Sequence, residues 1–371
     1  MTKAIFFVTG LDSGGIENYL LRFIQEKHLE YSEIVVYCKG GKGGQLEAEY
    51  KQFPNVKIVV NTISFFNPLH YYNLFRFLKR NQFDVVCDFT GNFAGLVLQM
   101  AYYANIRNRV GFYRGSSDHF KTNLIKQLYN NWVKYKVRKY ATNILSNSKA
   151  ALDYFFPQAW QKDDRYKVLY NGINPNKFNA SEDLRDEFGL SRESFVIGHT
   201  GRYNEAKNHD VIIKVAEILC EKYNDIYFIL CGNGVKVNLE AYLKQKGLEQ
   251  RILVFENRRD IPQFLKTMDV YFFPSITEGQ PNALLEALLM GLPFVASNIL
   301  PIQEVVPSIF KKYLSAPDNV ETFVSLLEEV KHNPISSEEK KELQKYITTN
   351  FNATKQFGAF NNILKSNTKM I

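Results

Sequence analysis

Long apolar runs are missing from this 371-residue sequence, and cysteine is scarce. The apolar run near the start, Ala4 to Val8, is too short for the core of a signal peptide, and no stretch approaches the ~18 apolar residues of a membrane-spanning helix. The four cysteines have neither metal-ligand nor redox spacing and are Cys38, Cys87, Cys220 and Cys231. We therefore expect a cytoplasmic protein with reduced, mostly buried thiols that is not exported and does not cross a bilayer.

Compositional extremes are missing too. Hydrophobic residues make up 45% of the chain and charged residues 23%, which excludes wholesale disorder. Neither a low-complexity segment nor an aligned internal repeat is visible. Because the length exceeds that of one ordinary domain, we expect two domains.

Charge is distributed unevenly along the chain. Residues 1–175 hold 23 Lys and Arg against 13 Asp and Glu, a net charge of +10, whereas residues 176–371 hold 23 against 25, a net charge of −2. A basic first half beside a nearly neutral second half indicates an anionic partner on one side only, such as an anionic membrane surface or a phosphate-bearing acceptor.

What the sequence does contain is a regular alternation of short β-rich runs and longer helical patterns. Continuous apolar strands separated by helices are typical of a parallel sheet covered on both faces. The expected strands are Ala4–Thr9, Glu33–Cys38, Val56–Val60, Val85–Asp88, Arg109–Phe112, Asn143–Ser146, Lys167–Tyr170, Phe195–Thr200, Ile226–Cys231, Ile252–Phe255, Val270–Phe273 and Phe294–Ala296.

The strand pattern restarts after Asn171–Asn179, a stretch dense in turn formers. We therefore predict an α/β protein of two doubly wound Rossmann-like domains facing across a cleft, with residues 1–174 in the first domain and 175–352 in the second. A last helix, at about 353–371, could pack back onto the first domain. Because open parallel sheets bind ligands at the carboxyl ends of their strands, the loops after the strands are the candidate sites.

Two of these loops are rich in glycine or cations. After the first strand, Gly14 and Gly15 allow a close backbone approach to a ligand and open a helix whose amides favour an anion, although a tight turn would also explain them. After the first strand of the second domain, Gly201 relieves crowding, and Arg202 and Lys207 suit the charge of a nucleoside diphosphate. An ordinary loop with solvated cations is the alternative there.

A third loop carries two carboxylates. Glu278 follows strand Val270–Phe273, and Glu286 lies two turns into the apolar helix that begins after Pro281. A carboxylate on such a helix needs a polar partner, and the hydroxyl pair of a ligand would serve. A surface glutamate on the one exposed stripe of the helix is the alternative.

These motifs together resemble those of the family-four retaining glycosyltransferases, which have the two-Rossmann GT-B fold. Glu278 and Glu286, with seven residues between them, are similar to the E-x7-E motif of that family. The remaining motifs occur in family order and span the chain: Gly14-Gly15-Ile16-Glu17, Asn171-Gly172, Gly201-Arg202 and Lys207-Asn208. The ordered set is specific to the family, although each piece alone is not.

The resemblance implies a role for each matched residue. Arg202 and Lys207 would neutralise the diphosphate of a UDP- or GDP-linked sugar, Glu286 would hold the ribose and Glu278 the transferred sugar. The backbone amides that would complete the phosphate cradle belong to Gly14, Gly15, Asn282, Ala283 and Leu284, and the base would lie near Arg258. Such enzymes need no metal, and no Asp-x-Asp motif occurs in the chain to hold one.

The chain departs from the family in one segment. Many relatives carry a His-rich segment after the fifth strand, where this sequence places Arg114, with His119 five residues later. Arg114 would bind a carboxylate or phosphate of donor or acceptor, because a guanidinium suits either. A structural salt bridge is the alternative.

A basic, aromatic helix is expected over residues 118–139. Its cations and aromatics suit an anionic bilayer surface and a lipid-linked acceptor, so residues 118–140 would form a peripheral membrane contact. A solvated basic helix is the rival interpretation. Nucleic acid is not expected, because no recognition motif accompanies the charge.

The predicted activity is transfer of a sugar from a nucleotide sugar to a saccharide or lipid-linked acceptor with retained configuration, in the assembly of cell-surface polysaccharide or glycolipid. Two alternatives remain open. One is a nucleotide-sugar epimerase or phosphorylase on the same scaffold, and the other is a catalytically degenerate transferase that acts as a binding partner.

Overall fold

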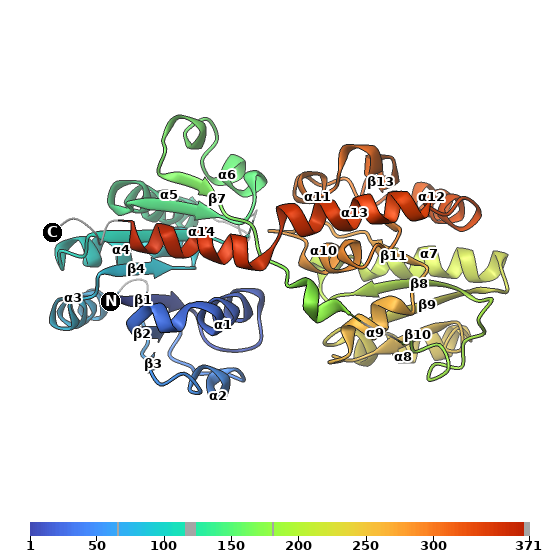
Figure 1. The fold of residues 1–371 in the computed structure, drawn as a ribbon, viewed down its shortest axis with the longest axis horizontal. Helices are drawn as coiled ribbons and strands as arrows, with labels where there is room; N and C mark the ends of the chain where they lie inside the picture. The colour runs from blue at the N-terminus through green and yellow to red at the C-terminus, as the bar shows by residue number, and fades with distance from the viewer. Residues whose placement is uncertain (65–66, 116–123, 180–181, 367–371) are drawn as a thin grey trace. The chain divides into compact units, whose positions relative to one another are not determined.

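The computed structural model describes residues 1–64, 67–115, 124–179 and 182–366. The chain divides into two compact units, shown in Figure 1. The first comprises Met1–Gly172 together with Ala353–Ile371, and the second comprises Ile173–Asn352. Each unit is built around its own parallel sheet.

The first unit contains a seven-stranded sheet in the order β3-β2-β1-β4-β5-β6-β7, with every neighbouring pair parallel. Strand order reverses between β1 and β4, which creates a topological switch point at the carboxyl edge of the sheet. The strands are β1 (Thr2–Val8), β2 (Tyr31–Cys38), β3 (Val56–Val60), β4 (Val85–Asp88), β5 (Asn108–Tyr113), β6 (Asn143–Ser146) and β7 (Tyr166–Val168).

Alternate residues of β1 point to opposite faces of this sheet, and both faces are covered. Phe6 packs into one core with helices α1 (Gly15–Lys27), α2 (Glu47–Tyr50) and α14 (Ala353–Lys365). Phe7 packs into the other core, whose helices are α3 (Pro68–Asn81), α4 (Gly95–Tyr103), α5 (Leu124–Tyr140) and α6 (Lys149–Phe155).

The last helix of the chain belongs to the first unit. Phe360, on α14 (red in Figure 1), lies 4.8 Å from Phe23 of α1 and 5.6 Å from Phe112 of β5, measured between ring centroids. The side chain of Asn361 accepts a hydrogen bond from the Tyr31 hydroxyl at 2.7 Å. Residues more than 300 positions apart in the sequence thus share one aromatic core.

The second unit contains a six-stranded parallel sheet in the order β10-β9-β8-β11-β12-β13, which reverses between β8 and β11. Its strands are β8 (Phe195–Thr200), β9 (Ile226–Cys231), β10 (Ile252–Phe255), β11 (Val270–Phe273), β12 (Phe294–Ser297) and β13 (Leu314–Ser315). Its helices are α7 (His209–Lys222), α8 (Val235–Lys246), α9 (Ile261–Lys266), α10 (Asn282–Leu289), α11 (Leu300–Val305), α12 (Val320–His332) and α13 (Ser337–Asn350).

The structure confirms the predicted class of two doubly wound parallel units, with differences in detail. The strand expected at Lys167–Tyr170 lies at Tyr166–Val168, and β13 was not predicted because two residues leave no periodic signal. The basic helix expected over residues 118–139 is described from Leu124 to Tyr140, and its first part lies outside the described residues. Among the residues that the structure describes, no helix is long and apolar enough to cross a membrane.

Candidate active site

A pocket lies at the carboxyl edge of the second sheet, around its switch point. The segments after β8, β9, β10 and β11 supply its walls, the last of them through helix α10, because they all leave the same edge of a parallel sheet. The pocket has a volume of about 260 Å³. It is lined by Thr200, Gly201, Arg202, Cys231, Gly232, Asn257, Arg258, Ile261, Ala283 and Glu286.

Two glycines allow the loops after β8 and β9 to cross closely. A Cβ atom on Gly232 would stand 2.0 Å from the carbonyl oxygen of Gly201, which no side chain could tolerate without movement of the backbone. The crossing is fixed by a hydrogen bond from the Tyr203 amide to the Asn233 carbonyl oxygen at 2.9 Å. The floor of the pocket is therefore bare backbone, which a ligand can approach closely.

The two arginines of the pocket differ in how they are held. Arg258 is paired with Asp260 at 2.5 Å and with Glu187 at 3.0 Å, and the hydrogen bonds to Asp260 raise the pKa of its guanidinium. Arg202 is exposed, and no ion pair involves it in the described part of the chain. Ion pairs thus hold the Arg258 side chain in place, whereas the exposed guanidinium of Arg202 is accessible to an anionic ligand.

Lys207 and Glu278 form an ion pair beside this pocket. Lys207 Nζ lies 2.6 Å from Glu278 Oε1, and the two side chains are only 18% and 11% exposed. The ammonium group also lies 4.5 Å from the centroid of the Phe273 ring. A Cβ atom on Gly201 would stand 3.2 Å from the Lys207 Cδ atom. The ion pair therefore adjoins the lining of the pocket.

Asn208 holds this ion pair at the edge of the sheet. Its backbone is left-handed, with φ of 58°, a conformation that asparagine tolerates better than most residues. Its side-chain amide donates to the carbonyl oxygens of Pro274 at 3.0 Å and Pro317 at 2.7 Å. The Ile276 amide in turn donates to the Ala206 carbonyl oxygen at 2.9 Å. The loops after β8 and β11 are thereby tied together.

Glu286, on α10, reaches the pocket at the edge of the second sheet. It lines the pocket, while its neighbours Leu285 and Ala287 are fully buried in the core. Burial raises the pKa of the Tyr271 hydroxyl, and the charges of Glu286 and Glu278 raise it further, which places both carboxylates near this one phenol. The first turn of α10, which begins at Asn282, offers backbone amides to an anion.

Two buried histidines beneath Lys207 were not predicted as part of the site. His199 Nδ1 lies 2.9 Å from the Phe272 carbonyl oxygen, and its ring centroid lies 5.2 Å from that of His209. Burial, with the charge of Lys207, lowers the pKa of His209 to about 4, and burial lowers that of His199 well below its ordinary value. Both rings are therefore neutral at pH 7. Only their positions, near the end of β8 and at the start of α7, could have indicated them.

The glycine-rich loop of the first unit leads directly into α1. Gly14 is the N-cap of the helix in an extended conformation, and the Asn18 side chain donates to its carbonyl oxygen at 2.9 Å. A Cβ on Gly14 would stand 2.5 Å from Glu17 Oε2, so the carboxylate lies over the glycine. Gly15, the first helical residue, has open space around it.

Arg114 lies at the end of β5 in the same unit, between aromatic rings. Its guanidinium carbon is 3.9 Å from the Tyr19 ring centroid and 5.0 Å from that of Phe112. Its Nε and Nη1 atoms are buried and find no hydrogen-bond partner among the described residues. Burial lowers the pKa of this guanidinium to about 10. A buried cation with unused donors is suited to an anionic ligand.

The structure thus collects most of the predicted residues into two groups, each within one unit. Gly14, Gly15 and Arg114 belong to the first unit, and His119 lies outside the described residues. The second unit holds the others, which are Gly201, Arg202, Lys207, Arg258, Glu278, Asn282, Ala283, Leu284 and Glu286. In the described ranges, no group of three or more His, Cys, Asp or Glu side chains could hold a metal ion.

The fold matches solved structures along the whole chain. It aligns with HepE from Anabaena, solved in complex with UDP-glucose, at a TM-score of 0.80 and 19% identity, covering 99% of this chain and 100% of that one. It also aligns with WaaG, a glycosyltransferase involved in lipopolysaccharide biosynthesis, at a TM-score of 0.72 and 15% identity, covering 97% of this chain and 99% of that one. The fold is therefore that of the GT-B glycosyltransferases.

Sequence comparisons give the family. The model described as Glycosyltransferase Family 4 matches residues 13–177, and the model described as Glycosyl transferases group 1 matches residues 180–350. The chain belongs to this family and is a glycosyltransferase. Its relatives include UDP-Gal:alpha-D-GlcNAc-diphosphoundecaprenol alpha-1,3-galactosyltransferase of Escherichia coli, 27% identical over 76% of each chain. Another is the capsular polysaccharide biosynthesis glycosyltransferase CapH of Staphylococcus aureus, 27% identical over 82% of this chain and 84% of that one.

Proposed function

We propose that this glycosyltransferase moves a sugar from a nucleoside-diphosphate sugar to a saccharide or lipid-linked acceptor, with retention of configuration, in the synthesis of cell-surface polysaccharide or glycolipid. The observation that carries the proposal is the convergence of Arg202, Lys207, Glu278 and Glu286 at one sheet edge. Two cations and two carboxylates there match the charges and hydroxyls of a nucleotide sugar. The complex of HepE with UDP-glucose favours a UDP-linked donor.

Each residue of this edge has a distinct role in the proposal. Arg202, which is exposed and has no competing ion pair in the described ranges, grips the diphosphate. Glu286 accepts the ribose hydroxyls from the wall of the pocket, and Arg258 is a fixed wall on the base side. The amides of Asn282, Ala283 and Leu284 add the positive end of α10 to the phosphate cradle.

The ion pair between Lys207 and Glu278 is the part of the site that changes when the donor binds. The 2.6 Å contact compensates both charges, although the two side chains are largely buried. A diphosphate that takes up the ammonium group breaks this contact, and Glu278 then accepts hydroxyl groups of the transferred sugar. The pair therefore couples phosphate recognition to sugar recognition.

The chemistry that we propose depends on the leaving group. Breaking the bond between the anomeric carbon and the diphosphate places negative charge on the phosphate oxygens, which Arg202, Lys207 and the α10 amides are positioned to stabilise. A phosphate oxygen of the donor accepts the proton of the attacking acceptor hydroxyl, so the reaction needs neither a protein nucleophile nor a metal ion. Attack from the face that the diphosphate leaves retains the configuration.

The acceptor is proposed to contact the first unit. The E. coli relative is named for an acceptor on diphosphoundecaprenol, and CapH for capsular polysaccharide. Helix α5 carries five cations and no carboxylate, which suits a peripheral contact with an anionic membrane surface. Arg114, whose buried Nε and Nη1 atoms have no partner among the described residues, is proposed to bind a phosphate or carboxylate of donor or acceptor.

The experiment that tests the proposed function combines binding with product analysis. A thermal-shift screen against UDP- and GDP-linked sugars identifies the donor, because a ligand that binds only the folded protein raises Tm more as its concentration exceeds its Kd. Incubation of that donor, radiolabelled, with lipid-linked and saccharide acceptors should yield free nucleoside diphosphate and a labelled glycoside. An isomerised nucleotide sugar would indicate an epimerase instead, and binding without turnover on any acceptor would indicate a degenerate transferase.

Arg114 has a test of its own. Arg114→Ala should raise the KM for donor or acceptor by roughly tenfold or more, because it removes a charged donor from a buried anion site. The measurement is steady-state kinetics with each substrate varied in turn. If both constants stay at their wild-type values, the assignment of Arg114 is wrong.

A further inference from the structure

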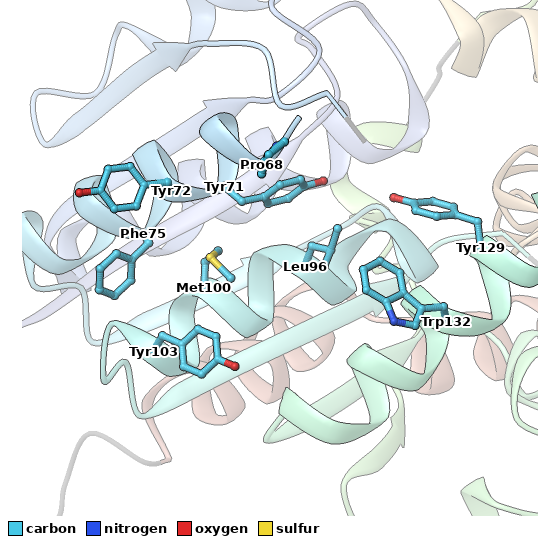
Figure 2. Close-up of a pocket in the computed structure, with 9 residues that line it drawn as sticks. All are labelled: Pro68, Tyr71, Tyr72, Phe75, Leu96, Met100, Tyr103, Tyr129 and Trp132. Atoms are coloured by element: carbon cyan, nitrogen blue, oxygen red, sulfur yellow. The ribbon is translucent and has the colours of Figure 1, made fainter. Parts of the chain in front are cut away.

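An apolar groove crosses the outer surface of the first unit, on the face opposite to α1 and α14. Figure 2 shows Leu96 and Met100 of α4 in its middle, side chains of α3 on one side and Tyr129 and Trp132 of α5 on another. Its volume is about 830 Å³, within the range of ligand sites. The lining consists of Pro68, Tyr71, Tyr72, Phe75, Leu96, Met100, Tyr103, Tyr129 and Trp132.

Helix α4, which forms the floor of this groove, is apolar except for Gln99. Its sequence, GLVLQMAYY, contains no charged residue. Val97, Leu98 and Ala101 point into the core beneath the sheet, whereas Met100 and Tyr103 point outward into the groove. A helix with so few polar residues is ordinarily buried. The outer face of α4 is therefore suited to an apolar ligand.

The walls leave large apolar side chains in contact with solvent. Tyr72 is 56% exposed, Tyr103 50% and Trp132 45%. Scattered single exposures are common on protein surfaces, but these three line one continuous groove. Contiguous apolar surface of this kind marks a binding site.

Cations stand over the aromatic walls. Lys79 lies 5.6 Å from the ring centroid of Phe75, Arg76 lies 5.9 Å from that of Tyr72, and Lys136 lies 5.1 Å from that of Trp132. Helix α3 carries three Lys and Arg residues and α5 carries five, and neither contains a carboxylate. The groove is therefore apolar inside and positive at its rim, which complements a lipid with an anionic head group.

One end of the groove reaches the carboxyl edge of the sheet. Burial raises the pKa of the Tyr71 hydroxyl, and the charges of Tyr129 and Asp88 add to the shift, so the phenol lies near the end of β4. There Lys39 Nζ contacts Asp88 Oδ2 at 2.8 Å and Thr90 Oγ1 at 2.6 Å. A chain in the groove would thus emerge at the sheet edge where parallel α/β units bind ligands.

We propose that the groove over α4 binds the isoprenoid chain of a polyprenyl-diphosphate-linked acceptor. The groove ends at the carboxyl edge of the sheet, so a lipid chain in it would hold its head group at the edge where parallel α/β units bind ligands. The cations at its rim suit the diphosphate that joins such a chain to its saccharide. The inference rests on the proposed function, because it names the lipid that this transferase holds while it extends the attached sugar.

The experiment measures binding of farnesyl diphosphate and of inorganic diphosphate to the full chain by calorimetry, with UDP present in excess to occupy the nucleotide pocket. The two probes share a diphosphate and differ by one isoprenoid chain. We expect farnesyl diphosphate to bind tenfold or more tightly, because burial of only two methylene groups is worth about that factor. Met100→Gln should abolish the difference, and Leu29→Gln, on an exposed apolar residue of the same unit, should preserve it.

If Met100→Gln fails to fold, a photoreactive farnesyl diphosphate tests the proposal on the wild-type protein. Irradiation of the wild-type protein should label peptides from α3, α4 or α5, and label confined to other segments overturns the proposal. Equal affinity for the two probes, or an undiminished difference in folded Met100→Gln, also overturns it.

Other occupants give different results. If Met100→Gln weakens binding to phosphatidylglycerol vesicles but farnesyl diphosphate shows no advantage, the groove takes acyl chains and the proposal is wrong. If the variant instead abolishes a dimer seen without lipid, the occupant is a second copy of the chain, and the proposal is wrong again. A failure of the proposed function is separate, because it appears as absent stabilisation by every nucleotide sugar in the wild-type protein.

Discussion

The pocket at the edge of the second sheet and the groove over α4 are built in opposite ways. Loops and charged side chains form the pocket, with Arg202 and Glu286 on a floor of glycine backbone. Faces of three helices form the groove, with aromatic and aliphatic side chains and cations only at the rim. The pocket is suited to a polar ligand of fixed geometry, and the groove to a chain that is recognised by its apolar surface. One transferase can thus keep donor chemistry and lipid binding in separate units.

Removing Lys207, the cation beside the pocket, should have the largest effect. Lys207→Ala should lower kcat by roughly 100- to 1,000-fold, because it removes a charge that stabilises the leaving diphosphate and breaks the ion pair with Glu278. Lys214→Ala, on the exposed side of α7, is the matched control and should retain full turnover. The measurement is release of nucleoside diphosphate at saturating donor. Near-normal turnover of Lys207→Ala would falsify its assignment.

The two buried histidines near Lys207 predict a pH dependence that the groove lacks. The pKa of His209 is about 4 in the folded protein and about 6.5 in the unfolded chain, so between these values only the unfolded chain takes up the proton. The free energy of unfolding is therefore fully retained above pH 6.5 and falls by up to about 3 kcal/mol as the pH drops towards 4.

Replacement of His209 tests whether this ring causes the loss of stability at low pH. His209→Phe should remove this part of the pH dependence, which urea unfolding at pH 7 and pH 4.5 measures as a difference between variant and wild type. The same loss of stability in both proteins between these pH values would show that the ring does not titrate in this way.

A matched pair of glycines distinguishes the two regions. A Cβ on Gly232 would stand 2.0 Å from the Gly201 carbonyl oxygen, and one on Gly95 would stand 2.2 Å from the Val133 carbonyl oxygen, where α4 meets α5. Each change to alanine should destabilise the protein by about 1–3 kcal/mol because of overpacking. Gly232→Ala alone should also weaken nucleotide binding, measured by calorimetry. Equal nucleotide affinity in the two variants would remove the distinction.

The smallest effect is expected at Gly358, a position that belongs to neither region. This glycine lies inside α14, and a Cβ there would meet nothing within 4 Å. Gly358→Ala should therefore stabilise the protein by about 0.5–1 kcal/mol, because alanine loses less backbone entropy in a helix. Thermal unfolding measures the gain, and a lower Tm would contradict it.

The sequence was a good guide to the pocket and a poor guide to the groove. Strand ends can be predicted from apolar runs and turn formers, and parallel strands bring their following loops to one edge, so Arg202, Lys207, Glu278 and Glu286 could be grouped in advance. Their mutual geometry could not be predicted, because the ion pair of Lys207 with Glu278 depends on the left-handed Asn208 and its bonds to two distant carbonyl groups.

The groove over α4 could not be predicted from the sequence. Its lining comes from three helices separated by many residues, and the same apolar periodicity indicates a core-facing stripe as readily as an exposed one. The cations and aromatics of residues 118–140 were expected to suit an anionic bilayer surface, with no division among the aromatics foreseen. In the structure they divide, with Trp132 in the groove and Tyr140 buried.

The return of α14 to the first unit has a consequence for synthesis of the protein. Phe357 and Phe360 complete an aromatic cluster whose other members are encoded before residue 113. During translation, one face of the N-terminal sheet is therefore covered only by α1 and α2 until the whole second unit has left the ribosome. Nascent chains stalled after residue 172 should display that face to chaperones.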